Sequence, residues 1–385
     1  MLYCIGHKKA SSPRQVVSRV ETRGPGTLLQ RRWIPALHAT GRARRKCGVR
    51  AFAGMTVGML VLLSSFAGAF GKSDAGTSGA VFLKIGPGAR PAGMGEAFTG
   101  VADDIHAIYW NPAGLAKLKH PELTGMHMQW FQNVSYEFAA FAYPTQTRGT
   151  WGFAVTNLHT DDIERRTEDT DAPLERFGAS DSAYWLSYAY PVTDRLSLGA
   201  NVKHIRLSLD SVHANAYAID GGITYDTDWH GLRLGSSLQN VGTQVKFVSE
   251  SDPLPLTIRM GASLQPIPKK LLLSMDVLIP RDHDIGLAVG GEYRHAVSKS
   301  MGYSVRAGYR SDSDVSGFAG VSAGGGLEIG RVGFDFAWVP FGDLGNSYRY
   351  AMHVKFGPAP NEKKGGGILE NSSQEFEPSL SFLTD

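Results

Sequence analysis

The stretch SLGANVKHI, residues 197–205, alternates between two kinds of side chain. The apolar members are Leu198, Ala200 and Val202. The members between them are polar or small, namely Ser197, Gly199, Asn201 and Lys203. Because successive side chains of a strand point to opposite faces, this pattern predicts a β-strand with one apolar and one polar face. The stretch YSVRAGYR, residues 303–310, repeats the pattern.

Fourteen segments with this alternation follow one another from residue 121 onward. Each has about ten residues or slightly more, the length at which a tilted strand crosses a bilayer. Their ranges are 121–131, 134–144, 148–159, 180–192, 194–207, 214–227, 231–240, 254–265, 270–280, 284–295, 300–310, 317–329, 331–340 and 347–357. The even number leaves both ends of the array on one side, so we predict an all-β fold, a 14-stranded antiparallel transmembrane β-barrel.

The connections between these segments fall into two length classes that alternate along the chain. The short class comprises QTR, TD, TDWHG, IPKK, AVSKS and GR, which follow every second segment. The long class includes residues 160–180 and 241–255, which we expect to be loops. Short periplasmic turns and longer outer loops are typical of outer-membrane barrels, whereas a soluble sandwich has no reason to separate its loops by length.

Charged side chains lie on the polar face of the predicted strands. In a dry core each would need a partner, whereas a hydrated or plugged lumen tolerates them. We therefore predict lumen-facing positions for Lys203, Asp220, Arg233, Arg259, Asp276, Glu292, Arg306 and Asp335. Aromatic residues near strand ends are expected to form an interfacial girdle, and they are Tyr143, Trp151, Tyr190, Tyr225, Tyr293 and Phe356.

The first part of the chain differs in charge from the rest. Residues 1–69 contain twelve Lys or Arg and one acid, Glu21, whereas 27 basic and 35 acidic residues follow Ala69, a net charge of −8. The net charge of +3 for the whole chain therefore gives no sign of a nucleic-acid partner. Both cysteines, Cys4 and Cys47, lie in the first part, so the remainder has no disulfide and no cysteine metal site.

A basic region, an apolar core and small residues follow one another near Arg50, as in a secretory signal peptide. The apolar core is MTVGMLVLLSSF, and AGA, residues 67–69, offers the cleavage site. A membrane anchor is the alternative, but the apolar run is short for a spanning helix. The preceding residues are long for such a signal, which leaves Val49 or Met55 as alternative starts of the chain.

The run GARPAGMGEAFTGVADDIHAIYWNPAG, residues 88–114, is the most distinctive in the chain. A phosphate-binding loop would place Lys and Ser or Thr after its last glycine, but Met94 and Gly95 follow Gly93. A dinucleotide fingerprint needs a parallel βαβ unit, which antiparallel hairpins do not supply. We expect instead a compact segment with a short helix over residues 92–102 and a turn at Asn111 and Pro112.

Together with Leu115 and Ala116, this run resembles the N-terminal signature of the PorV/PorQ family of outer-membrane proteins. That family is part of the FadL-like superfamily of fourteen-stranded barrels with an N-terminal plug. LQNVG (238–242), PLPLTIRMGASL (253–264), VRAGYR (305–310) and the last strand extend the resemblance from Gly79 to Gly357. It implies a small, partly helical plug inside the barrel. Its motif residues are Arg90, Gly93, Gly95, Glu96, Asp103, Asp104, Asn111, Pro112, Ala113 and Gly114.

The expected organisation of the chain follows from these signals. A disordered basic extension covers residues 1–50 and the hydrophobic region of the signal peptide covers 51–69. The plug segment covers 70–120, the barrel 121–357, and a flexible C-terminal tail 358–385. We expect export through a cleaved signal peptide to the outer membrane of a Gram-negative-type bacterium.

The resemblance implies two activities. PorV-type members shuttle cargo of the type IX secretion system, whereas FadL-like barrels take up hydrophobic compounds. Because the match to PorV/PorQ is closer, we expect a part in protein secretion. The expected partners are outer-membrane lipid and the C-terminal signal domains of secreted proteins or other secretion components. Uptake of a hydrophobic small molecule is the alternative, and we expect no nucleic acid and no cofactor.

An outer-membrane hydrolase is the least favoured alternative. Its candidate groups are Asp282, His283 and Asp284 in the stretch PRDHD, together with His204, His213 and His353. No serine or acid stands in a recognisable nucleophile frame, so we expect neither a catalytic nor a metal site.

Overall fold

The computed structural model describes residues 76–130, 134–145, 148–166, 168, 171–229, 231–312 and 319–357. The predicted basic extension, signal-peptide region and C-terminal tail lie outside these residues. Within the part of the chain that is described, no helix is long and apolar enough to cross a membrane.

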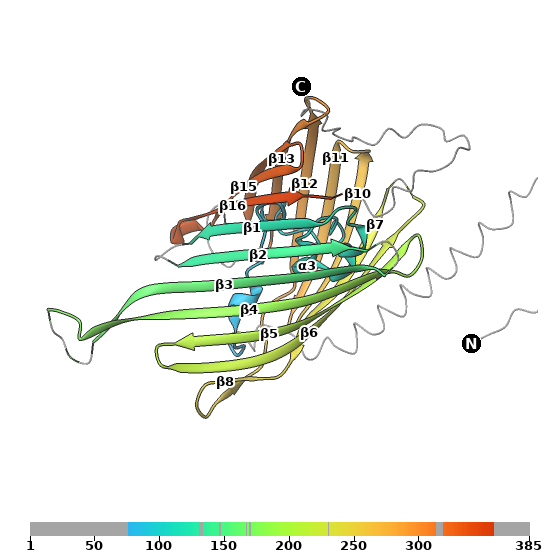
Figure 1. Ribbon diagram of the computed structural model, residues 1–385. Helices are drawn as coiled ribbons and strands as arrows, with labels where there is room; N and C mark the ends of the chain where they lie inside the picture. The colour runs from blue at the N-terminus through green and yellow to red at the C-terminus, as the bar shows by residue number, and fades with distance from the viewer. Residues whose placement is uncertain are drawn as a thin grey trace, which may run out of the picture. The chain divides into compact units, whose positions relative to one another are not determined.

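Fourteen antiparallel strands form a closed barrel, which confirms the predicted fold class (Figure 1). Neighbours in the sequence are neighbours in the barrel, and β1 pairs with β16 to close it. The strands are β1 (Glu122–Gln129), β2 (Ser135–Pro144), β3 (Thr150–Arg165), β4 (Glu175–Pro191), β5 (Leu196–Leu209), β6 (Val212–Asp226), β7 (Arg233–Gly242), β10 (Thr257–Ile267), β11 (Leu271–Pro280), β12 (Gly286–Ala296), β13 (Met301–Arg310), β14 (Val321–Ile329), β15 (Val332–Pro340) and β16 (Asn346–Lys355). Closure satisfies the backbone of both edge strands, as a bilayer requires.

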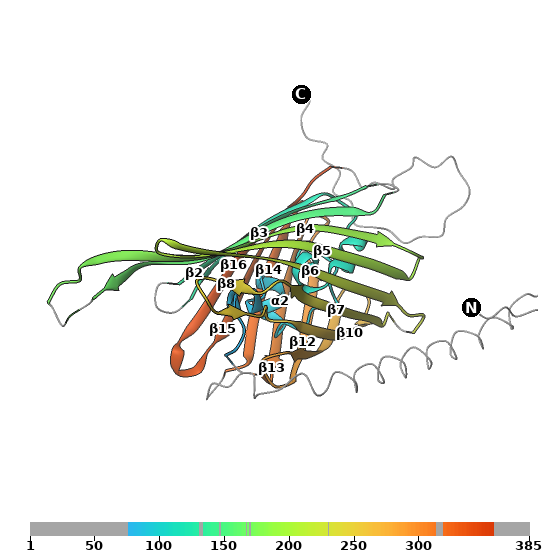
Figure 2. The same cartoon turned by 90° about the horizontal axis from the view of Figure 1, so that it is seen from below.

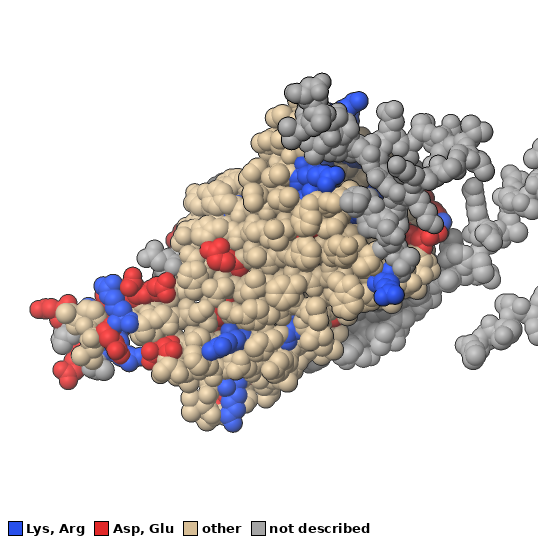
Figure 3. Space-filling view, viewed as in Figure 1, with Lys and Arg blue, Asp and Glu red and all other residues tan. Residues whose placement is uncertain are grey.

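The alternation in the sequence becomes an alternation of exposure. In β1 buried and exposed residues alternate over all eight positions. On β5, Leu198 and Val202 face outward, whereas Asn201 and Lys203 face inward and are buried. On the side shown in Figure 3 the wall is mostly uncharged, and charged side chains gather on the hairpin of β3 and β4. This outer face is what contact with lipid requires.

The two ends of the barrel differ in their connections. Short connections join β2 to β3, β4 to β5, β6 to β7, β10 to β11, β12 to β13 and β14 to β15. We call this side the turn end, and both Glu122 and Lys355 lie there because they are paired at the closure of the barrel. The other side is the loop end. Its connection between β7 and β10 contains a separate sheet of β8 (Val245–Lys246) and β9 (Ser251–Asp252).

One expected loop is largely strand. Residues 160–180 continue β3 and β4, whose pairing extends to Arg165 opposite Glu175. The hairpin projects beyond the rest of the barrel at the loop end (Figures 1 and 2). Its charged residues indicated a loop, yet outside a bilayer a hairpin needs no apolar face and gains from opposite charges across the strands. A short η4 (Gly342–Leu344) follows β15 at the same end.

Residues 76–120, which we call the inner segment, precede β1. They form η2 (Val81–Lys84), α2 (Ala89–Gly93), α3 (Ala107–Trp110) and η3 (Pro112–Lys117). The helix expected over residues 92–102 does not form. Its cause is backbone geometry, because Gly95 and Glu96 have φ angles of 62° and 64°, a left-handed conformation that ends a right-handed helix.

The inner segment runs inside the barrel from the loop end to the turn end. Near its start, Lys84 pairs with Asp282 in the connection after β11, with 2.6 Å between Nζ and Oδ2. Near its end, Lys117 pairs with Asp226, the last residue of β6. Between these points α2 contacts β13 to β16, and η3 contacts β3 to β6 on the other side. The segment therefore spans the interior in both length and width.

Candidate functional site

Arg90, on α2, joins the inner segment to the barrel wall. Its Nε and Nη2 donate to the two carboxylate oxygens of Glu292 on β12, at 2.9 and 3.2 Å. Its Nη1 lies 2.7 Å from Asp103 Oδ1 and 2.5 Å from Asp104 Oδ2. A guanidinium held by three carboxylates in a buried position fixes both partners, since such bonds are strong and directional.

The same cluster shifts the pKa of its members in the inner segment. Burial by itself raises the pKa of Asp104, but His106 and Arg90 outweigh burial and hold that pKa well below its ordinary value of 3.8. Burial lowers the pKa of Arg90, but Asp103, Glu292 and Asp104 together raise it well above its ordinary value. Both groups are therefore charged in the folded protein at neutral pH.

The ion pairs continue from Glu292 along the inner face of the wall. Arg306 on β13 donates to Glu292 and to Asp335 on β15, each at 2.6 Å. His353 on β16 lies 3.4 Å from the other oxygen of Asp335. Charges buried in this way are stable only when each has a partner, so the network opposes removal of any single member.

Asn111 anchors the opposite side of the inner segment. Its Nδ2 donates to the carbonyls of Thr99 and Ile223, both at 3.0 Å. Its Oδ1 accepts from the backbone nitrogen of Ala113 at 3.3 Å and so caps η3, which begins with Pro112. One side chain therefore joins two parts of the inner segment to β6.

Inward polar residues of the wall bind the backbone of the inner segment. Asp276 accepts from the backbone nitrogens of Phe98 and Thr99, at 3.0 and 2.7 Å. Asn201 donates to the carbonyl of Ile108 at 2.8 Å and also to Asp220, which in turn lies 2.7 Å from Lys203. These contacts satisfy backbone groups that a short, irregular segment cannot pair within itself.

Two inward arginines reach the middle and the end of the inner segment. The guanidinium of Arg259 lies 4.7 Å from the centre of the Trp110 ring, a cation–π contact. Arg233 donates to the carbonyl of Val101 at 2.8 Å and to Asp226 at 2.7 Å. Of the eight charged residues that we predicted to face the lumen, four bind the inner segment directly, namely Glu292, Asp276, Arg259 and Arg233. Arg306 and Asp220 bind a residue that does, and Lys203 and Asp335 are one ion pair further away.

Glycines allow the inner segment to touch the wall backbone. A Cβ atom on Gly308 of β13 would lie 2.0 Å from the nitrogen of Gly95, and one on Gly95 would lie 2.6 Å from the nitrogen of Tyr309. Gly93 approaches Gly324 in the same way, at 3.1 Å between its Cβ position and Cα. The glycines of the motif therefore serve close packing, not the binding of a phosphate.

The remaining motif residues are also buried. Glu96 pairs with Arg310 and lies 3.4 Å from Arg349. Ala113 has no exposed surface, and a Cβ atom on Gly114 would lie 2.0 Å from the carbonyl oxygen of Ala102. Several of the ten motif residues therefore contact the wall directly, among them Arg90, Gly95 and Asn111.

Several contacts were not anticipated from the sequence. Arg349 donates to the carbonyl of Gly86 at 2.6 Å, and Gln239 donates to that of Tyr109 at 2.5 Å. Arg310 and Asn201 make further contacts, and both lie on the polar face of the two stretches with the clearest alternation. Their position was a usable signal, because an inward polar residue in a filled barrel needs a partner.

The residues considered for a hydrolase are not brought together. His204 lies 3.2 Å from Asn215 and His213 lies 2.8 Å from Ser208, on neighbouring strands β5 and β6. Asp282 binds Lys84, which lowers its pKa below the ordinary value although burial raises it. Among the residues described, no group of three His, Cys, Asp or Glu could hold a metal ion.

The aromatic residues expected in a girdle lie near the turn end of their strands. Five of them are exposed, namely Tyr143, Trp151, Tyr190, Tyr293 and Phe356. Trp151 and Tyr188 lie side by side, with 4.7 Å between ring centroids. Tyr225 is partly buried. An aromatic rim of this kind is typical of the level where a bilayer meets water.

The chain is similar to one protein family and to several solved structures. The profile of an uncharacterised protein family, UPF0164, matches residues 64–218. A search of curated proteins finds no match. Among solved structures, the Ralstonia pickettii toluene transporter TbuX is 14% identical, covers 71% of this chain and 99% of its own, and gives a TM-score of 0.48.

Two further structures are similar at the same level. The monoaromatic hydrocarbon channel CymD is 13% identical over 71% of this chain and 98% of its own, with a TM-score of 0.48. The Pseudomonas putida toluene transporter TodX is 12% identical over 70% of this chain and 96% of its own, with a TM-score of 0.44. The strand pairing of the chain itself establishes the closed barrel.

Proposed function

We propose that the protein is an outer-membrane transport barrel, without catalytic activity, in which the inner segment is a plug that gates the passage of hydrophobic small molecules. The observation that carries this proposal is the path of the inner segment, from Lys84 at the loop end to Lys117 at the turn end. A solute that crosses the barrel must displace at least part of this segment. Its polar contacts are reversible, so they suit a gate better than a permanent seal.

The two ends of the plug differ in a way that favours an apolar solute. Near the loop end, the buried residues of η2 and the adjacent wall are apolar, and they are Phe82, Leu83, Ile205, Leu207, Val245 and Leu254. Trp130 and Phe341 add a ring pair with centroids 5.7 Å apart. A compound that arrives from outside therefore meets this apolar layer beside the ion pairs of Lys84 with Asp282 and of Arg310 with Glu96.

The turn end has polar residues around the end of the inner segment. A hollow of about 240 Å³ lies there, between the inner segment and the wall. Its lining includes Asp103, Asp226, Arg233 and Gln265. An apolar solute is poorly suited to these polar surroundings. We therefore propose that the charged network blocks its passage until the plug moves.

Uptake of a labelled monoaromatic hydrocarbon tests this proposal. The full chain would be produced in the outer membrane of a host that lacks hydrocarbon channels, with empty-vector cells as the baseline. Uptake above the baseline, which a hydrophilic solute of similar size does not share, is the expected result. Equal uptake in both cell types would contradict a role in hydrophobic transport.

A second candidate function is secretion, in which the loop end receives a protein. The projecting hairpin of β3 and β4 favours it, because its exposed surface carries charges of both signs. Arg165 pairs with Glu175 and Asp210, and Arg176 lies 3.6 Å from Asp162. Such a surface is suited to a polar protein partner and has no evident use for an apolar solute.

Shortening this hairpin separates the two candidates. A variant in which a tight turn replaces residues 161–178 retains the barrel wall. If the protein serves secretion, the variant loses co-purification with C-terminal signal domains of secreted proteins but keeps hydrocarbon uptake unchanged. Loss of uptake without any effect on bound protein would count against secretion.

A further inference from the structure

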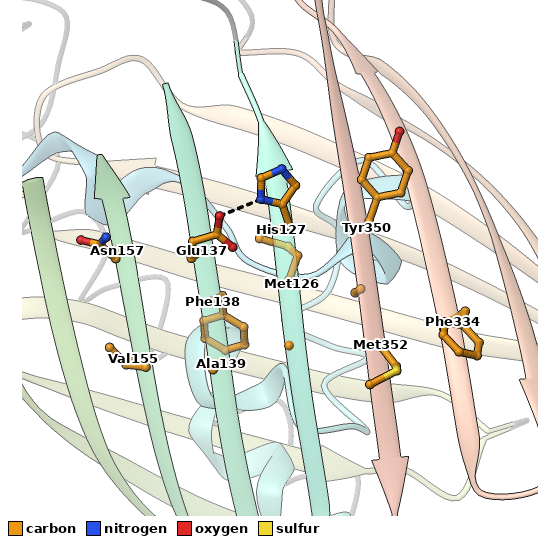
Figure 4. Close-up of a pocket in the computed structure, with 12 residues that line it drawn as sticks. Met126, His127, Glu137, Phe138, Ala139, Val155, Asn157, Phe334, Tyr350 and Met352 are labelled. Carbon is orange, nitrogen blue, oxygen red and sulfur yellow. Dashed lines mark hydrogen bonds and ion pairs between the residues drawn. The ribbon is translucent and has the colours of Figure 1, made fainter. Parts of the chain in front are cut away.

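The outer face of the wall has a hollow of about 520 Å³ where β1, β2, β3, β15 and β16 meet (Figure 4). It lies on the side away from the plug, so it is separate from the site described above. Its volume falls within the range of small-molecule pockets, about 300–1,000 Å³. A hollow on the lipid-facing side of a barrel faces the hydrocarbon chains of the bilayer.

Strand register explains why the wall is hollow at this point. Gly125 of β1 lies opposite Ala139 of β2, and both face outward. A Cβ atom on Gly125 would meet no other atom within 4 Å. Larger outward residues surround the two small ones, with Met352 opposite Gly125 and Val155 opposite Ala139. Two small residues side by side therefore leave a gap in an otherwise bulky apolar surface.

A polar pair borders this gap toward the loop end. His127 lies opposite Glu137, and His127 Nδ1 is 2.7 Å from Glu137 Oε1 (Figure 4). Their side chains are 48% and 44% exposed, so the pair faces outward. Ionisable groups on a lipid-facing surface are costly and uncommon unless they bind something polar.

The pair belongs to a polar row that runs across six strands in one register. Glu137 lies opposite Asn157, Asn157 opposite Ser182, and Arg206 lies opposite both Ser182 and Asn215. Ser182 donates to Asn157 at 3.0 Å. On these strands the row marks the point at which outward side chains change from apolar to polar, as they do where hydrocarbon gives way to lipid head groups.

We propose that the hollow is a lipid-binding site in which one phospholipid lays an acyl chain over Gly125 and Ala139 and hydrogen-bonds its head group to His127 and Glu137. The order of groups along the wall matches that of an amphiphile, with the polar pair at the row and the apolar gap beneath it. The pair presents an acceptor and a donor, so it suits a head group that carries both an ammonium and a phosphate.

Native mass spectrometry of the full chain tests the site. The protein would be reconstituted in vesicles of phosphatidylethanolamine and phosphatidylglycerol, extracted in detergent and measured for retained lipid. Wild-type protein is expected to keep one lipid. Ala139→Phe fills the hollow and is expected to lower the retained fraction by about tenfold, because each methylene displaced from apolar contact weakens binding several-fold.

Ala200→Phe is the matched control, since Ala200 also faces outward, on β5, away from the hollow. It is expected to retain lipid like wild type. Glu137→Leu keeps the hollow but removes the head-group contact, and it is expected to lie between wild type and Ala139→Phe. Equal retention in Ala139→Phe and Ala200→Phe would overturn the proposal.

Photo-crosslinking identifies the occupant in cells. A crosslinking side chain at position 139 is expected to label phospholipid more strongly than one at position 200. A protein adduct at position 139 would instead assign the hollow to a protein partner and overturn the lipid site. Lipid labelling at position 200 shows that the wall lies in the membrane. If position 200 labels lipid and position 139 does not, the lipid site is excluded but the transport proposal is unaffected.

Discussion

The inner and outer faces of the same wall constrain their residues very differently. Gly308 faces inward on β13, where an added Cβ would lie 2.0 Å from the backbone of Gly95. Gly221 faces outward on β6, where an added Cβ would meet nothing within 4 Å. Inward residues are therefore fitted to one partner of fixed shape, whereas outward residues away from the outer hollow are fitted only to a solvent. The function that we propose depends on the fitted face.

The largest difference in stability is expected between substitutions of Gly308 and of Gly221. Gly308→Leu would force the side chain into the backbone of the inner segment, and overpacking of this kind costs about 3 kcal/mol or more. Gly221→Leu is expected to change the free energy of unfolding by less than about 0.5 kcal/mol. Heat-modifiable migration in gels measures the folded fraction, and protease sensitivity of the inner segment shows whether it is displaced. Equal folded fractions and equal protease sensitivity in the two variants would contradict the claim that the inner face is the more constrained one.

A smaller but still large effect is expected from two arginines. Arg90→Met leaves Glu292 and the two aspartates without their shared partner, at a cost of about 3 kcal/mol. Arg195→Met removes an exposed ion pair with Asp228 at the turn end, which solvent screens, so a much smaller loss of stability is expected. Urea unfolding in vesicles, followed by tryptophan fluorescence, measures both. A loss at Arg195 as large as that at Arg90 would show that burial does not set the difference.

Two asparagines sharpen the comparison further. Asn111→Ala leaves the carbonyls of Thr99 and Ile223 without its amide donor and is expected to cost about 1–3 kcal/mol. Asn215→Ala, on the outer face of β6, removes a contact with exposed His204 and is expected to cost less than about 0.5 kcal/mol. The same unfolding measurement applies. If the two costs are equal, Asn111 is not an anchor of the inner segment.

The smallest effect on the inner segment is expected from a fall in pH. The pKa of Asp104 is lower in the folded protein than its ordinary value of 3.8, so its stabilising contribution is complete above that value and is lost as pH falls through the lower pKa. Protease sensitivity of the inner segment should therefore rise below about pH 4 in wild type. Asp104→Asn should respond less to pH over the same window. An identical pH response in both proteins would exclude this carboxylate as the cause.

The sequence predicted the strands well and the partners poorly, for physical reasons. Alternation in stretches such as 197–205 is a local property, so it reveals a strand and its faces directly. The strands over residues 160–180 were predicted to be a loop, because charged residues outside a bilayer can pair into strands that have no apolar face. The contact of Arg90 with Glu292 depends on barrel closure and strand register, which place residues 202 positions apart within bonding distance.

The outer hollow illustrates the same limit. Gly125 and Ala139 are unremarkable in the sequence, and only the pairing of β1 with β2 places them side by side. Met352 reaches the same point because β16 closes on β1. The alternation shows which face of a strand a residue occupies, but strand register decides which residues on that face become neighbours.

Conductance in planar bilayers tests the central claim, that the inner segment closes the barrel, most directly. The measurement compares wild type with the double variant Arg90→Met and Asn111→Ala, both confirmed to be folded by heat-modifiable migration. The account predicts a low, steady conductance for wild type and a clear rise, with frequent open events, for the variant. A folded variant that conducts no more than wild type would contradict a gate held by these contacts.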